Sequence, residues 1–345
     1  MNDDVNGIAG ETVATDSIEL QALDRARDAL QNGDGPGAEK ALAEALEINP
    51  KLTAALELRA MVACQKGDFE AGLQDFRELT VLEPSTDTAW LNLGKCQRDS
   101  GDSAGAIASL SRALEISPEM ADAQILLGLS QRDSGDGDNA LTTLEDAVQR
   151  HPQHLAGITA LAMQYQSMGR AEDALAQFTT ARDLQPTMPH THYNLGRAQL
   201  EANQMPEARE SFEQALTINH HYHQARLGLA ELAQRQGDAD TAINIYRRLT
   251  RRAPRLHQAH VSMMALLISE RRASELQNQM DYSESLFAET DFPRFWQAEL
   301  MALRGNTQRA LEQLKLLREK PQPLLDPKAL DNAIERLTPP TETSS

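Results

Sequence analysis

Residues 87–118 read DTAWLNLGKCQRDSGDSAGAIASLSRALEISP and contain nearly one full period of a pattern that runs through most of the chain. In the first half Trp90 and Leu93 lie three residues apart, and in the second half Leu110 and Ala113 do the same. Apolar residues at this spacing lie on one face of an α-helix. The letters SGD between the halves are typical of a turn. The stretch therefore predicts two amphipathic helices joined by a short turn.

Prolines and glycines recur along the chain at one shared interval of 34 residues. The prolines are Pro50, Pro84, Pro118, Pro152, Pro186 and, two intervals later, Pro254. The glycines are Gly33, Gly67, Gly101, Gly135, Gly169, Gly237 and Gly305. Glycine takes the left-handed conformation that follows a helix, and proline stops the next helix because it lacks a backbone N–H. In five periods an Asp follows the glycine, where its carboxylate can cap the second helix. The two columns together predict a tandem array of helix pairs.

The pattern resembles that of the tetratricopeptide repeat (TPR) family, in which 34-residue helix-turn-helix units carry W-x₂-L-G-x₂-Y followed by Ala, Phe, Ala and Pro columns. The best match is Trp90, Leu93, Gly94, Ala106, Ala113 and Pro118. The resemblance implies an all-α fold, a right-handed superhelical solenoid of about nine repeats whose first helices line the concave side. We place the frames at residues 19, 53, 87, 121, 155, 189, 223, 257 and 291.

One frame departs from the family pattern. In frame 257–290, Arg271 replaces the turn glycine and Ala288 stands where proline is usual. Leu276 and Met280 also stand where the family has Ala and an aromatic residue. This degenerate frame is either a distorted repeat or an interaction surface.

The domain organisation that we expect has four parts. The TPR array occupies residues 17–324, and residues 325–338 form a capping helix, because DPKAL is a favourable helix start. Residues 1–16 and 339–345 contain too few apolar side chains for a core, so their composition favours a disordered N-terminal segment and a disordered tail.

The charge of the chain is strongly acidic and uneven. The formal net charge is −18; residues 1–173 carry 30 acids and 13 bases, and residues 174–345 carry 21 acids and 20 bases. A negative surface repels phosphate backbones and anionic lipids, which argues against nucleic-acid or membrane partners. Because no stretch approaches ~18 consecutive apolar residues, we expect a soluble, cytoplasmic protein.

The sequence gives little support for a metal site, a cofactor site or a catalytic site. We interpret Cys64 and Cys96 as small buried thiols rather than a disulfide or metal pair, because neither has a CxxC partner or a histidine at ligand spacing. The nine histidines lie in or beside the expected inter-repeat turns and are interpreted as surface residues, with metal binding by HTH or HHYH as the alternative. We therefore expect no metal, no cofactor and no catalytic residue.

Five arginines lie close together at the end of the seventh frame, within the letters IYRRLTRRAPRL: Arg247, Arg248, Arg251, Arg252 and Arg255. Their alternation with Tyr246 and Leu249 is typical of a solvated outer helix face near a C-terminus. The alternative is a docking surface for the acidic half of a second copy, which would make the protein a homo-oligomer.

The candidate binding residues lie on the first helices, at positions that the family resemblance places in the groove. They are Asn92, Lys95, Arg98, Arg132, Tyr193, Asn194 and Arg197. Arg98 and Arg132 occupy the same position in adjacent frames, so stacking should bring them together, either as a paired contact for an anion or as ordinary helix C-terminal cations. The carboxylate clamp of chaperone-binding TPR modules is not matched, since Glu57 and Val62 stand where Lys and Asn are needed.

These observations favour a non-catalytic scaffold or adaptor that binds a protein or peptide partner. The expected mode is an extended segment in the concave groove of frames three to six. Two alternatives remain open. One is a self-assembling scaffold that uses Arg247–Arg255 or the degenerate eighth repeat, and the other is an accessory arm that recruits a separate transferase-type enzyme.

Overall fold

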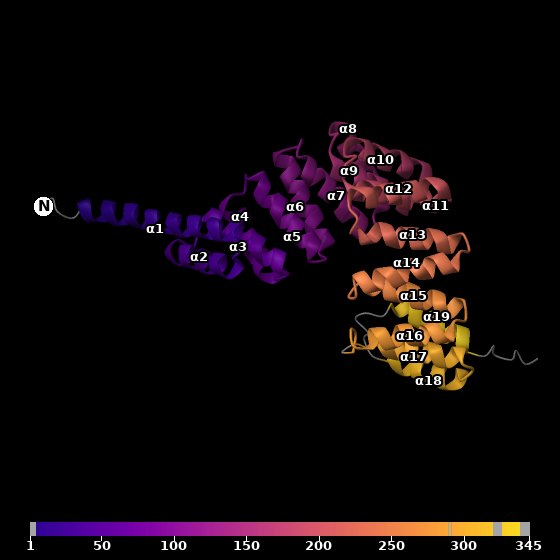
Figure 1. Cartoon of the computed structure of the whole chain (residues 1–345). Helices are drawn as coiled ribbons and strands as arrows, with labels where there is room; N and C mark the ends of the chain where they lie inside the picture. The colour runs from indigo at the N-terminus through magenta and orange to yellow at the C-terminus, as the bar shows by residue number, and fades with distance from the viewer. Residues whose placement is uncertain (1–4, 289, 291, 320–325, 339–345) are drawn as a thin grey trace, which may run out of the picture. The chain divides into compact units, whose positions relative to one another are not determined.

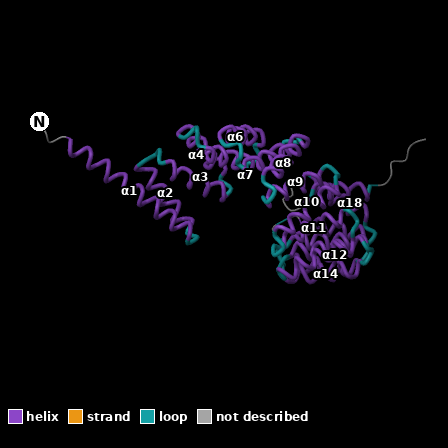
Figure 2. Tube along the Cα trace, turned by 90° about the horizontal axis from the view of Figure 1, so that it is seen from above, coloured by secondary structure: helices purple, strands orange, loops and turns teal. Residues whose placement is uncertain are grey.

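The computed structural model describes residues 5–288, 290, 292–319 and 326–338, with side chains from residue 18 onward. In that part of the chain the regular secondary structure is entirely α-helical (Figure 2). The helices are α1 Val5–Gln31, α2 Gly35–Ile48, α3 Thr53–Lys66, α4 Phe69–Leu82, α5 Asp87–Asp99, α6 Ser103–Ile116, α7 Ala121–Asp133, α8 Gly137–Arg150, α9 Leu155–Ser167, α10 Ala171–Leu184, α11 Pro189–Glu201, α12 Met205–Ile218, α13 His223–Arg235, α14 Ala239–Arg252, α15 His257–Ser269, α16 Ala273–Glu284, α17 Phe292–Leu303, α18 Thr307–Arg318 and α19 Pro327–Leu337.

The helices group into two compact units, 1–184 and 185–345. Within each unit, consecutive helices pack side by side, as α5 and α6 do in the first and α11 and α12 in the second (Figure 1). First helices also contact the first helix of the next repeat, as in α5 with α7 and α15 with α17. The odd-numbered helices therefore form one layer of each unit, and the even-numbered helices form the other. The architecture is an all-α solenoid of helical repeats.

The repeat period agrees with the helix starts. The seven odd-numbered helices from α3 to α15 begin at residues 53, 87, 121, 155, 189, 223 and 257. These are positions at which we placed the starts of frames. The N-terminal segment differs from the disorder that we expected through residue 16, because α1 already begins at Val5. The C-terminal helix α19 follows Asp326, whose side chain accepts a hydrogen bond from the Lys328 N–H. The expected tail 339–345 lies outside the described residues.

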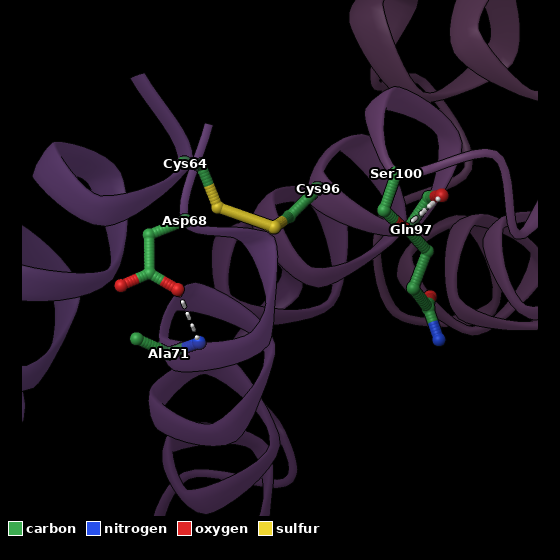
Figure 3. The surroundings of a disulfide bond; sticks show 6 residues. All are labelled: Cys64, Asp68, Ala71, Cys96, Gln97 and Ser100. Atoms are coloured by element: carbon green, nitrogen blue, oxygen red, sulfur yellow. Dashed lines mark hydrogen bonds between the residues drawn. A yellow bond between two sulfur atoms is a disulfide. The ribbon is translucent and has the colours of Figure 1, made fainter. Parts of the chain in front are cut away.

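The turns follow the chemistry of the repeated glycine and aspartate. Gly101 has φ +88°, and the Asp102 carboxylate accepts a hydrogen bond of 2.9 Å from the Gly105 N–H. The Asp68 carboxylate caps α4 in the same way (Figure 3). Where glycine is missing the backbone keeps the left-handed conformation, with φ 60° at Asn203 and 55° at Arg271. The degenerate eighth frame therefore retains its helix pair and its turn.

Small residues allow the two helices of a repeat to approach closely. A Cβ atom added at Gly94 would lie 2.7 Å from Leu110 Cγ, and one at Gly128 would lie 2.7 Å from Leu144 Cγ. Ala106 faces the same junction and is fully buried. Because such contacts leave no room for a larger side chain, the glycines in the first helices fix the spacing between the two layers.

Candidate partner-binding site

The two cysteines form a disulfide between the first helices of neighbouring repeats, so our interpretation of free buried thiols was wrong. Cys64 lies on α3 and Cys96 on α5, with Cα atoms 6.3 Å apart (Figure 3). They occupy different positions in their frames, which made them look unpaired, but a separation of 32 residues is close to the repeat period and brings them onto adjacent first helices. Gly72 leaves the space for the bond, because a Cβ at this position would collide with Cys64 Sγ.

A hollow of about 520 Å³ lies beside this disulfide, between α1, α3 and α5. Its lining is mainly apolar and includes a few polar side chains. The lining residues are Leu30, Leu58, Met61, Val62, Cys64, Gln65, Phe76, Asn92, Lys95, Cys96 and Asp99. Met61 is 49 % exposed although its neighbours are apolar. A concave apolar surface with a few polar groups is the usual form of a binding site.

Two of the sequence-predicted residues lie at the edge of this hollow. The Asn92 side chain donates a hydrogen bond of 3.0 Å to Glu57 Oε1 on α3, which holds its amide group in place. Lys95 is exposed, and none of the carboxylates in the described part of the chain forms an ion pair with it. The hollow itself was not predicted, because Leu30, Met61 and Asn92 belong to three different repeats and meet only through stacking.

Arg98 and Arg132 are brought together by one carboxylate. Asp133 Oδ2 accepts from Arg98 Nε at 2.9 Å, and Asp133 Oδ1 lies 3.2 Å from the Arg132 guanidinium. Asp99 lies 3.8 Å from Arg98 as a second, weaker partner. The two cations therefore share an internal anion, and an external carboxylate would have to compete with Asp133 for them.

The three predicted residues of α11 belong to the second unit. The Tyr193 ring packs against Phe212 and Tyr222, with ring centroids 6.0 and 5.7 Å away. Arg197 lies 3.4 Å from the Tyr193 hydroxyl and 3.3 Å from Glu201. Tyr193 is thus half-buried in the packing of its own repeat. Asn194, which follows Tyr193 on α11, is also half-buried.

The histidines do not all lie on the surface, as we had interpreted them. His260 is fully buried; its Nε2 lies 3.0 Å from the Pro254 carbonyl and its Nδ1 lies 3.0 Å from the Gln279 amide. Burial lowers the pKa of His260 and also that of His257. No cluster of histidine, cysteine or acidic side chains in the described part of the chain has the arrangement of a metal site.

The arginine segment at the end of α14 is divided between paired and exposed side chains. Arg247 forms an ion pair of 2.7 Å with Glu275, while Tyr246 and Leu249 are buried beneath it. The other four are exposed: Arg248, Arg251, Arg252 and Arg255. Arg248, Arg251 and Arg252 lie on α14, in the even-numbered layer of the second unit, and Arg255 lies in the turn that follows.

These features define a class of protein: an all-α solenoid of stacked helix pairs, an architecture that typically serves as a non-catalytic scaffold for protein–protein interaction. None of the described helices is long and apolar enough to cross a lipid bilayer.

The sequence of the chain matches the profiles of one known repeat family. Tetratricopeptide repeat profiles match residues 23–79, 58–121 and 159–223, and a second such profile matches 97–163 and 205–267. These matches cover more than half of the chain, which therefore belongs to the tetratricopeptide repeat family. A search of curated proteins finds no match.

Solved structures with a similar fold include three that share 19–20 % of residues with this chain. A tetratricopeptide repeat protein from Parabacteroides merdae is 20 % identical, with a TM-score of 0.56 over 73 % of this chain and 98 % of that one. The type IV pilus biogenesis factor PilW is 20 % identical, with a TM-score of 0.53 over 59 % of this chain and 94 % of that one. Human IFIT1, solved as a dimer with PPP-AAAA, is 19 % identical, with a TM-score of 0.55 over 81 % of this chain and 67 % of that one. At this identity the likeness shows the fold alone.

Proposed function

We propose that the protein is a non-catalytic scaffold that binds an extended segment of a protein partner on the layer of first helices. The observation that carries the proposal is the apolar hollow between α1, α3 and α5, with Asn92 and Lys95 at its edge. In this arrangement an apolar side chain of the partner enters the hollow beside Met61. The Lys95 ammonium and the Asn92 amide bind carboxylate or carbonyl oxygens of the same segment.

The remaining predicted residues extend the proposed surface along the first helices. Arg98 and Arg132 follow on α5 and α7, where a partner carboxylate would displace Asp133 from one of them. Tyr193, Asn194 and Arg197 on α11 offer a second contact surface in the other unit. We assign the main affinity to the hollow, because buried apolar contacts contribute more than exposed charge pairs.

The test is affinity purification of partners on immobilised protein, followed by titration of the partner that is recovered. Met61→Asp places a charge in the hollow and should weaken partner binding at least about tenfold. Val81→Asp makes the same change on α4, at a side chain that is 78 % exposed and belongs to the other layer, and should leave binding unchanged. Equal binding by both variants would overturn the hollow as the site.

Two further variants test the polar residues. Lys95→Ala should weaken binding severalfold, and Lys40→Ala, an exposed lysine of α2, is its control. The double variant Arg98→Ala/Arg132→Ala should weaken binding of a partner that carries a carboxylate. If every partner is retained at unchanged affinity, the arginine pair is not part of the site.

Self-assembly is a second candidate because of the four exposed arginines at and just after the end of α14. They would meet acidic side chains of the first unit of another copy, since that half of the sequence carries the excess of acids. Light scattering at low and high salt tests this candidate, and a monomer at every concentration and at low salt removes it.

The disulfide also bears on the cellular compartment in which the protein works, which we had expected to be the cytoplasm. Disulfides persist in oxidising compartments and are rare where glutathione keeps thiols reduced. We therefore propose that the chain works in an oxidising compartment. Acid quenching of cells, alkylation of free thiols and intact-mass measurement should show no added alkyl groups; two added groups would restore the cytoplasmic expectation.

A further inference from the structure

A second cavity, of about 660 Å³, lies in the second unit between α15, α17 and α19. The first two are the first helices of the eighth and ninth frames, and α19 is the C-terminal helix, which packs against α17 and α18. Small-molecule sites usually have volumes of ~300–1,000 Å³. The cavity is therefore large enough for a ligand of that kind.

Most of the lining is apolar. Val261, Ile268 and Ala329 are half-buried, so the protein leaves part of each side chain uncovered. Phe295 and Trp296 belong to the α17 wall and are almost fully buried. A hydrocarbon group that enters the cavity removes apolar surface from water, which favours binding. The body of a ligand should therefore be apolar.

Three charged side chains belong to the lining, and two of them neutralise each other. The Glu299 carboxylate is 4 % exposed, and Arg336 of α19 donates to its Oε1 at 2.7 Å. The third is Asp326, which is exposed and forms no ion pair with the side chains that the structure describes. His257 adds no charge near neutral pH, because burial lowers its pKa. The lining thus has an excess of one negative charge.

The Asp326 carboxylate has more hydrogen-bonding capacity than its own helix uses. Its Oδ1 accepts from the Lys328 N–H at 3.0 Å and so caps α19. Asparagine caps a helix about as well as aspartate, so capping does not require the charge. A carboxylate accepts several hydrogen bonds, and the one that caps the helix leaves capacity for a ligand. A negative charge in this position attracts a cation and repels an anion.

We propose that this cavity binds a small amphipathic organic cation, an amine with an apolar aliphatic or aromatic body. The body packs between Val261, Ile268 and Ala329, and the ammonium group donates to Asp326. The Asp326 carboxylate repels an anionic ligand, and a neutral ligand lacks the ion pair. This site goes beyond the proposed scaffold function, because it lies wholly in the second unit and takes no part in the hollow between α1, α3 and α5. The degenerate eighth frame supplies one of its walls through α15.

The test compares three probes that share one hydrocarbon body and differ in charge: phenylhexylamine, phenylhexanol and phenylhexanoate. Isothermal titration calorimetry on the full chain near neutral pH measures the affinity of each. The amine is protonated at this pH and should bind about three- to tenfold more tightly than the alcohol. The carboxylate should bind more weakly than the alcohol. Added salt should weaken binding of the amine and leave that of the alcohol unchanged, because only the amine forms an ion pair.

Two pairs of variants separate the charge of the site from its space. Asp326→Asn keeps the helix cap but removes the charge, so the amine should bind no more tightly than the alcohol. Glu335→Gln removes a charge at an exposed position of α19 outside the lining and should keep the preference for the amine.

The second pair changes the volume of the cavity. Ala265 lines the cavity from an exposed position on α15, so Ala265→Phe fills space there without entering the core. This variant should weaken binding of the amine and of the alcohol at least about tenfold. Ala176→Phe makes the same change at an exposed position of α10 and should bind both probes as the wild type does.

Several results would overturn the proposal. One is that the wild-type protein binds none of the probes, or binds the amine no more tightly than the alcohol or the carboxylate. Another is that Asp326→Asn keeps the preference for the amine, or that Ala265→Phe and Ala176→Phe bind the amine equally. A dimer that Ala265→Phe dissociates would make a second copy the occupant of the cavity. Met61→Asp should bind the amine normally, so failure of this site and failure of the hollow in the first unit can be told apart.

Discussion

His260 illustrates how a single residue departs from the pattern of its neighbours. Its place beside an inter-repeat turn predicted exposure, yet Tyr282 stacks on the ring, Phe287 meets it edge-on, and Gln279 binds it. The sequence could not reveal this environment, because Tyr282 and Phe287 belong to the irregular second half of the same frame. The residue is therefore a buried neutral base inside an aromatic cluster.

The burial of His260 predicts a loss of stability in acid. Its folded-state pKa is below the ordinary value of about 6.5, so the unfolded chain binds more protons as the pH falls through that value. The contribution of neutral His260 is complete above pH ~6.5 and declines below it. We expect urea-unfolding midpoints to fall between pH 7.5 and 5.0, and the fall to be smaller in His260→Gln.

Replacement of an exposed histidine provides the control for this effect. His221 lies on the surface, so His221→Gln should keep the pH dependence of the wild type. A His260→Gln protein with an undiminished pH dependence would show that other groups are responsible. His257 and His223, whose pKa values burial also lowers, contribute to the part of the effect that should remain in His260→Gln.

At the scale of the helix, the sequence predicts the architecture well and the sites poorly. The glycine and proline columns predict where helices begin and end, because backbone conformation at those positions is local. Asn92 and Lys95 were named from the positions that the family resemblance places in the groove, and the structure leaves Lys95 exposed and Asn92 half-buried. The hollow beside Met61 and the Cys64–Cys96 bond depend on contacts between different repeats, which a pattern in one repeat does not contain.

The second prediction concerns the spacing between helices and compares the replacement of two glycines that lie in different environments. Gly94→Ala should destabilise the protein by about 1–3 kcal/mol, because the new Cβ meets Leu110 at 2.7 Å. Gly137→Ala adds the same methyl where the nearest atom, Gln164 Nε2, is 3.5 Å away. This variant should be neutral or stabilising by up to about 1 kcal/mol, because Ala is the better helix former. Thermal unfolding followed by circular dichroism would measure both, and equal melting temperatures would contradict the assigned role of Gly94.

At the scale of the whole molecule, stability is the sum of many similar contacts between neighbouring repeats. The disulfide between α3 and α5 is the exception, since it joins two repeats covalently. Fixing two chain positions limits the freedom of the unfolded state in the loop between them. The second and third frames should therefore be the part of the first unit that opens last.

The third prediction concerns this bond. Treatment with dithiothreitol, or the double variant Cys64→Ser/Cys96→Ser, should lower the stability of the first unit by about 2–4 kcal/mol. The reductant should have no further effect on the double variant, which is the control for its action elsewhere. Hydrogen exchange resolved by mass spectrometry would locate the loss, and a change spread evenly over both units would contradict a local effect.

The same bond has a mechanical consequence. In a solenoid that is pulled at its ends, repeats separate from one another in turn, and the contour length grows as each helix pair unravels. The residues between Cys64 and Cys96 cannot add to that length while the bond is intact. A stretching experiment on the single molecule should thus show a shorter final extension in oxidising than in reducing buffer, and the difference would measure the loop that the disulfide closes.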